Sequence, residues 1–76
     1  MSRLTWRYVT TLKGATKLLP SFQPFVIDVD LSGGKHTVSD VRRYQNGGST
    51  APVEKFRSYS IEQCKRKIRR LIKEEK

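Results

Sequence analysis

The chain has 76 residues and a formal net charge of +9, from sixteen Lys and Arg against seven Asp and Glu. That length limits it to one small domain with one small hydrophobic core. Such an excess of positive charge attracts polyanions, of which nucleic acid is the commonest, although an anionic membrane or an acidic protein surface feels the same field.

A single cysteine and a single histidine exclude an internal disulfide and a zinc site built from these two residue types. The cysteine count favours a reducing compartment, the cytoplasm, or the host cytoplasm if the protein is viral. No apolar run approaches the roughly 20 residues that span a bilayer. The apolar arc of the C-terminal helix is narrow and lacks aromatic residues, so no membrane partner is expected.

The N-terminal stretch alternates with period two, which predicts a half-buried strand that ends at Gly14. One face of this strand carries Leu4, Trp6, Tyr8, Thr10 and Leu12. Residues 15–24 are predicted to form a loop, because two prolines interrupt them. Leu18, Leu19 and Phe22 in this loop either fold over the core or contact a partner, and the first interpretation is favoured because so short a chain has few other apolar groups.

Residues 25–31 are predicted to be a second strand with Phe25, Ile27, Val29 and Leu31 on one face. Gly33 and Gly34 follow, and two adjacent glycines suit a two-residue hairpin with positive φ at both positions. That turn would pair Leu31 with His36 and Val29 with Val38. A returning strand with a bulge is expected to continue to about Tyr44.

A polar, glycine-rich tip at residues 45–50 leads to Pro52, where any strand should be short and at a sheet edge. Residues 60–76 then read as one amphipathic helix. Ser60 is the expected N-cap, with Gln63 completing a capping box. The apolar arc of this helix contains Ile61, Cys64, Ile68, Leu71 and Ile72.

These elements predict an α+β fold in a single domain over residues 1–76. A small antiparallel sheet of three to four strands would pack against one C-terminal helix. Its core would combine Leu4, Trp6, Tyr8, Phe25, Ile27 and Val29 with Ile61, Cys64, Ile68 and Leu71.

Enzymatic chemistry is not indicated. His36 is the only histidine, Cys64 lies in the apolar arc, and the spacing suggests no nucleophile–base pair. Asp28 and Asp30 share a strand face, but a solvated face neutralised by a Lys or Arg from another strand is the favoured interpretation. We therefore expect no metal, no cofactor and no small-molecule substrate.

The basic residues instead predict a nucleic-acid-binding protein, with DNA preferred over RNA, which contacts the phosphate backbone through the helix and a basic strand. Tyr44 could offer a stacking face beside Arg43. The candidate contact residues are Arg42, Arg43, Tyr44, Lys55, Arg57, Lys65, Arg66, Lys67, Arg69, Arg70 and Lys73. Two alternatives remain open. One is a phage- or mobile-element-type protein whose cations bind an acidic patch on a host protein and inhibit it, and the other is a basic subunit of a larger ribonucleoprotein assembly.

One further pattern is a tryptophan in the first strand followed by F-x-S-x-S-x-E running into the helix, formed by Trp6, Phe56, Ser58, Ser60 and Glu62. It resembles the small sheet-plus-helix DNA-binding domains at the start of some phage integrases. The resemblance implies a three-stranded sheet, a following helix and DNA as ligand. Residues 15–24 and the glycine-rich tip depart from that pattern.

Overall fold

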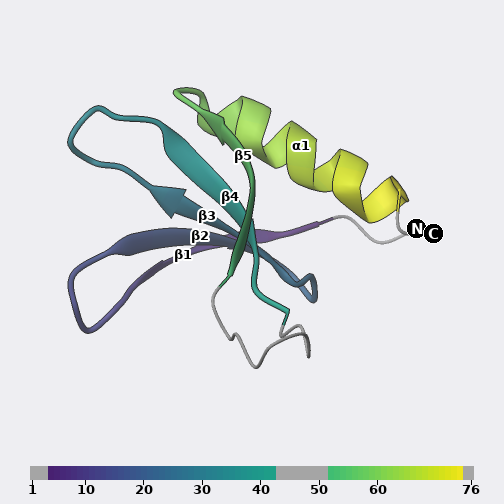
Figure 1. Ribbon diagram of the computed structural model, residues 1–76. Coiled ribbons are helices and arrows are strands. Elements are labelled where there is room, and N and C mark those ends of the chain that lie inside the picture. The colour runs from purple at the N-terminus through teal and green to yellow at the C-terminus, as the bar shows by residue number, and fades with distance from the viewer. Residues whose placement is uncertain (1–3, 43–51, 75–76) are drawn as a thin grey trace.

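The computed structural model describes residues 4–42 and 52–74. Five antiparallel strands, paired in sequence order, are followed by one helix, so β1 and β5 are the two edges of the sheet. The elements are β1 (Trp6–Thr10), β2 (Thr16–Pro20), β3 (Phe25–Val29), β4 (His36–Asp40), β5 (Val53–Ser58) and α1 (Ile61–Glu74). The helix packs on one side of the sheet, against β3, β4 and β5 (Figure 1). The predicted α+β class is confirmed, but the sheet has five strands rather than three to four.

The additional strand is β2, which lies where the sequence predicted a loop. Pro20 is tolerated because it lies opposite Trp6 at the end of the strand, where no ladder N–H is required from it. Leu18 is buried in the core, whereas Phe22 is fully exposed in the following turn with φ of 57°. The prediction that these apolar side chains fold over the core is therefore correct for Leu18 and wrong for Phe22.

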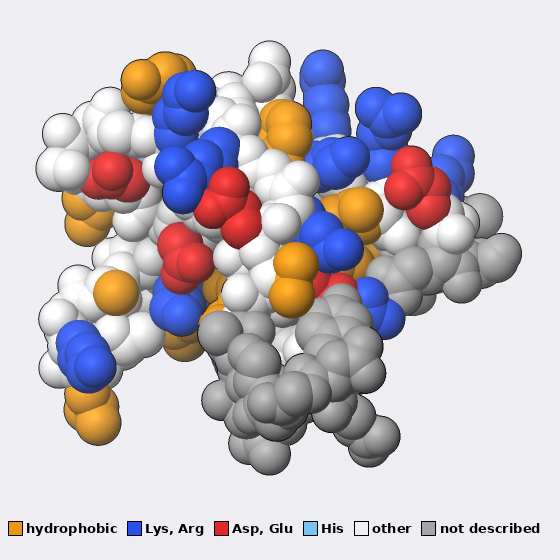
Figure 2. All heavy atoms as spheres, viewed as in Figure 1, with side chains coloured by type: hydrophobic (Ala, Val, Ile, Leu, Met, Phe, Trp, Pro, Cys, Tyr) orange, Lys and Arg blue, Asp and Glu red, His pale blue; other side chains and the backbone are white. Residues whose placement is uncertain are grey.

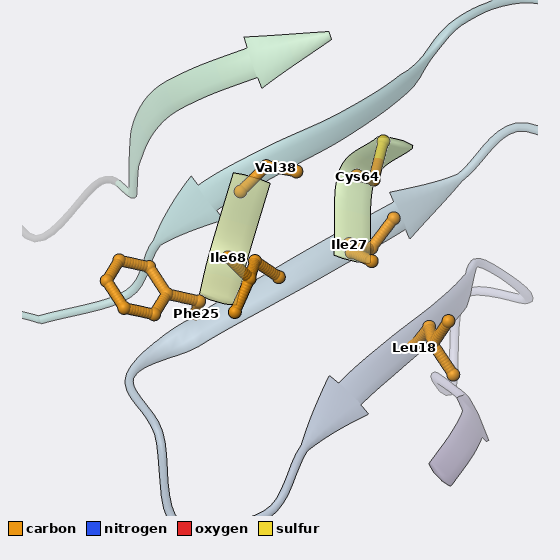
Figure 3. Packing of buried hydrophobic residues seen from close by; sticks show 6 residues of the cluster. All are labelled: Leu18, Phe25, Ile27, Val38, Cys64 and Ile68. Carbon is orange, nitrogen blue, oxygen red and sulfur yellow. The ribbon is translucent and has the colours of Figure 1, made fainter. Parts of the chain in front are cut away.

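The core lies between the sheet and the helix. Figure 3 shows Cys64 and Ile68 of α1 next to Phe25, Ile27 and Val38, with Leu18 on the neighbouring strand. The apolar side chains of α1 therefore pack against the inward-facing alternate residues of β3 and β4. Partly buried hydrophobic side chains surround this cluster: Trp6, Val29, Phe56, Ile61, Leu71 and Ile72.

Two predicted core positions, Leu4 and Tyr8, are not part of this cluster. Tyr8 follows Trp6 on the same face of β1 but is 62% exposed. The physical reason is that β1 is an edge strand and α1 packs over the opposite half of the sheet. Leu31, predicted to continue the strand face of Phe25, Ile27 and Val29, is 78% exposed because β3 ends at Val29.

The connection between β3 and β4 is longer than the predicted two-residue hairpin. Ile27 pairs with Val38, so the register differs by two residues from the predicted pairing of Val29 with Val38. Asp30 accounts for the difference, because its carboxylate accepts hydrogen bonds from the backbone N–H and the hydroxyl of Ser32. Of the two glycines in this turn, Gly33 alone has positive φ, at 99°, whereas a Cβ on Gly34 would lie 2.2 Å from the Asp30 carboxylate.

The second half of the sheet confirms the predicted edge position of the strand after Pro52, but β5 has six residues and is not the short strand expected, and the predicted bulge lies elsewhere. Val38 pairs with Phe56 and Ser39 pairs with Glu54, so the extra residue, Lys55, belongs to β5 rather than to β4. β4 ends at Asp40, so residues 41 and 42 do not form the predicted continuation of the strand, and Tyr44 lies outside the described residues.

The helix begins where the sequence predicted. The backbone N–H of Gln63 donates to the Ser60 hydroxyl at 3.2 Å, which confirms Ser60 as the N-cap. The second half of the capping box is replaced. Ser58 donates to the Gln63 side-chain oxygen at 2.8 Å and accepts from the Ser60 N–H at 3.1 Å, so its hydroxyl bridges the two groups that a capping box would join directly.

Candidate nucleic-acid interface

Three cations of α1 form a continuous exposed row, which we call the basic ridge: Arg66, Arg70 and Lys73. Their spacing of four and then three residues places them one above another on the side of the helix that faces away from Cys64 and Ile68. Figure 2 shows Lys and Arg side chains standing out along the helix. The ridge is about 10 Å long, seven residues at roughly 1.5 Å rise each.

Lys65 and Arg69 occupy one flank of the helix and reach toward the sheet. The Lys65 ammonium lies 5.4 Å from the centroid of the Trp6 ring, and the Arg69 guanidinium lies 6.0 Å from it. Lys65 also forms an ion pair with Glu62 at 3.6 Å, so Glu62 pairs with Lys65 and not with Arg66, which follows it by four residues. These two predicted contact residues therefore also attach α1 to β1 through cation–π interactions.

Lys67 lies on the other flank of the helix and is partly buried. Its helical angle places it between the ridge and the apolar residue Leu71. It would reach a ligand on the ridge only with the end of its flexible side chain.

Arg42 has a structural role that the sequence did not predict. Its guanidinium binds the carboxylate of Asp40 in a forked arrangement and lies 5.7 Å from the Phe25 ring centroid. Asp40 is fully buried, and the backbone N–H of Arg42 also donates to it at 2.9 Å. A buried carboxylate requires such a partner, so the first task of Arg42 is to stabilise Asp40.

The cations of β5 are separated from the helix by the sheet. Phe56 faces the helix, and the alternation of a strand therefore directs its neighbour Arg57 to the opposite side. Arg57 pairs there with Glu54 at 2.8 Å, while Lys55 is exposed at the bulge. Arg43 and Tyr44, the remaining predicted contact residues, lie outside the described residues.

An ion pair between two strands also lies on the face of the sheet opposite the helix. Lys17 of β2 pairs with Asp28 of β3 at 3.4 Å, and the two residues are direct register partners. This pair confirms the prediction that a cation from another strand would neutralise Asp28. The sequence could not identify Lys17 as that cation, because residues 15–24 were assigned to a loop.

The acidic and nucleophilic side chains are either hydrogen-bonded within the fold or buried in its core. Hydrogen bonds from Ser32, first from its hydroxyl and then from its backbone N–H, lower the pKa of Asp30. Burial raises the pKa of the Cys64 thiol, which keeps it unreactive. Nδ1 of His36 accepts a hydrogen bond from the Asp30 N–H at 2.9 Å. The described part of the chain contains no group of three His, Cys, Asp or Glu side chains that could hold a metal ion.

Comparison with protein-family models, with characterised proteins and with solved structures finds no match to this chain. Within residues 4–42 and 52–74, no helix is long and apolar enough to cross a membrane. The distribution of charge over the fold therefore carries the functional argument: the ridge of α1 is exposed and cationic, whereas several of the other predicted cations are bound within the domain.

Proposed function

We propose that this protein binds the phosphate backbone of nucleic acid through the basic ridge of α1. The observation that carries the proposal is the exposed row of Arg66, Arg70 and Lys73, with no ion pair to any of them among the described residues. By contrast, Arg42, Arg57, Lys17 and Lys65 each pair with a carboxylate.

The arrangement of the ridge disfavours a purely structural explanation. Like charges three or four residues apart on a helix destabilise it by about 0.2–0.5 kcal/mol per pair. Arg66 with Arg70 and Arg70 with Lys73 are two such pairs. Stability alone would favour Glu at one of these positions, so a polyanionic ligand that offsets the repulsion is a better explanation.

Duplex DNA is the ligand that the shape of this surface favours. Proteins that bind single strands use exposed aromatic side chains for base stacking, and residues 61–74 contain none. A helix about 10–12 Å across fits the B-DNA major groove, roughly 12 Å wide, whereas the major groove of A-form RNA is too deep and narrow for it.

The test is a fluorescence-anisotropy titration of labelled duplex DNA, duplex RNA and single-stranded DNA over a series of salt concentrations. The ridge variant carries Arg66→Gln, Arg70→Gln and Lys73→Gln. If each ridge cation meets one phosphate, its slope of log K against log salt should be smaller than that of the wild type by about 2.7, roughly 0.9 per phosphate.

The matched control carries Arg7→Gln, Lys13→Gln and Lys35→Gln, which removes the same charge from exposed positions on the strands and turns. It should keep most of the wild-type slope. Equal loss in both variants would show that net charge, not the ridge, is responsible. No measurable affinity of the wild type for DNA or RNA near about 100 mM salt would overturn the proposal.

A second function, binding to a protein partner, is favoured by Phe22. This aromatic side chain is 102% exposed and its backbone has φ of 57°, a conformation that bulky residues rarely adopt. If this function is the main one, affinity for the partner should survive the ridge variant and be lost in Phe22→Ala.

A further inference from the structure

The outer edge of β1 presents free backbone groups in a regular row. The N–H of Thr11 donates to the Ala15 carbonyl at 2.9 Å, and the N–H of Ser21 donates to the Thr5 carbonyl at 2.9 Å. Odd-numbered residues of β1 therefore bond to β2. Because hydrogen-bonded and non-hydrogen-bonded pairs alternate in an antiparallel ladder, the even-numbered residues direct their N–H and C=O groups to the open edge. These residues are Trp6, Tyr8 and Thr10.

The two edges of the sheet differ in how they are protected against further pairing. β5 is preceded by Pro52, carries a bulge at Lys55 and also contains the charged residues Glu54 and Arg57. These are the features by which natural sheets discourage edge pairing. β1 has no proline and no bulge, and Arg7 is its only charged residue.

From this edge we infer that two copies of the chain pair through β1, antiparallel and centred on Tyr8. In this register Tyr8 faces Tyr8 of the second copy, Trp6 faces Thr10, and Arg7 faces Val9 rather than a second Arg7. The three outward-directed residues of each copy then exchange N–H···O bonds with those of the other. Tyr8, which is 62% exposed in the single chain, gains an aromatic cross-strand neighbour.

The pairing places the two helices on the same side of one continuous ten-stranded sheet. Directly opposed residues of an antiparallel pair project to the same face, and Trp6 lies on the helix side of β1. The helix packs over β3 to β5, so it leaves the β1 edge open to the second copy. One consequence rests on the proposed function: if it is correct, the dimer presents two basic ridges to one polyanion. Binding of the first ridge then raises the effective concentration of the second, so the dimer binds more tightly than a single chain.

The charge of the chain predicts the salt dependence of the pairing. Each copy carries a formal net charge of +9, so long-range repulsion opposes association and salt screens it. Self-association through β1 should therefore strengthen as salt rises, whereas binding to nucleic acid should weaken.

Sedimentation velocity without nucleic acid tests the inference independently of the proposed function. The wild type should show a dimer fraction that rises with protein concentration and with salt. Tyr8→Lys opposes two cations across the centre of the pair and should abolish the dimer. Tyr59→Lys, the same substitution at a position that is 68% exposed outside β1, should behave as the wild type.

Disulfide trapping tests the register. Opposed residues of a hydrogen-bonded pair have Cα atoms about 5.5 Å apart, within the range that a disulfide spans. Tyr8→Cys should therefore form a cross-linked dimer on mild oxidation. Thr10→Cys should not, because the two copies of residue 10 would be separated by four residues along the strand, about 13 Å.

Three results would overturn the inference. One is a wild type that stays monomeric up to about 1 mM at high salt. Another is a dimer that survives Tyr8→Lys, which would mean pairing through a different surface. The third is cross-linking of Thr10→Cys as efficient as that of Tyr8→Cys, while circular dichroism shows both variants folded.

Discussion

Replacing Arg42 by Ala should destabilise this protein by about 3 kcal/mol, although the residue is exposed and lies two positions beyond the end of β4. Asp40 is fully buried, and the substitution removes the guanidinium that binds both carboxylate oxygens while leaving the backbone N–H bond at 2.9 Å. Removing one partner of a buried ion pair costs roughly 3–5 kcal/mol. The lower end applies because the Arg42 side chain is 45% exposed, so water can reach part of the space it leaves.

A double-mutant cycle isolates the interaction. Asp40→Ala with Arg42→Ala removes the buried charge together with its partner, so the pair should be less destabilised than the sum of the two single variants, by about 2 kcal/mol. Urea unfolding followed by Trp6 fluorescence gives the four free energies. Arg57→Ala is the control, since its exposed pair with Glu54 should contribute less than about 1 kcal/mol.

The same variant separates structure from binding. Because Arg42 is bound to Asp40, Arg42→Ala should leave the salt dependence of nucleic-acid binding unchanged under conditions where it is folded. A stability loss no larger than that of Arg57→Ala, or a coupling energy under about 0.5 kcal/mol, would refute the assignment of Arg42 to the fold.

Three further predictions concern the turn, the cap and the thiol. Hydrogen bonds from Ser32 lower the pKa of Asp30 in the folded state. The ionised carboxylate therefore stabilises the fold above its unfolded pKa, and this contribution is lost as pH falls through the folded pKa. An NMR titration should place the Asp30 midpoint below 3.8, and Ser32→Ala should move that midpoint upward. Ser60→Ala and Ser58→Ala should each lower the free energy of unfolding, by about 1 kcal/mol for Ser60, and a silent Ser58→Ala would contradict the bridging role of its hydroxyl. Burial raises the pKa of Cys64, so a disulfide reagent at neutral pH should label it slowly in the native protein and rapidly in urea; fast native labelling would contradict the packing.

The sequence by itself determined the elements whose signals are local. The N-cap at Ser60, the apolar arc around Cys64 and Ile68, and the existence of strands β1 and β3 depend on residues a few positions apart, and the structure confirms them. Both strands end earlier than predicted, at Thr10 and Val29, and burial does not alternate along either of them. The same holds for the exposure of the ridge, because helical geometry alone opposes Arg66 and Arg70 to the apolar arc.

Tertiary structure alone decided the features that depend on pairing between distant segments. The status of residues 16–20 as a strand follows from neighbours on both sides, which tolerate Pro20 at its end and bury Leu18. The separation of Arg57 from the helix by the sheet, the pairing of Lys17 with Asp28 and the capture of Arg42 by Asp40 all depend on register and burial. Composition counts these residues as equal positive charges, and only the fold distinguishes the cations it neutralises from those it leaves facing solvent.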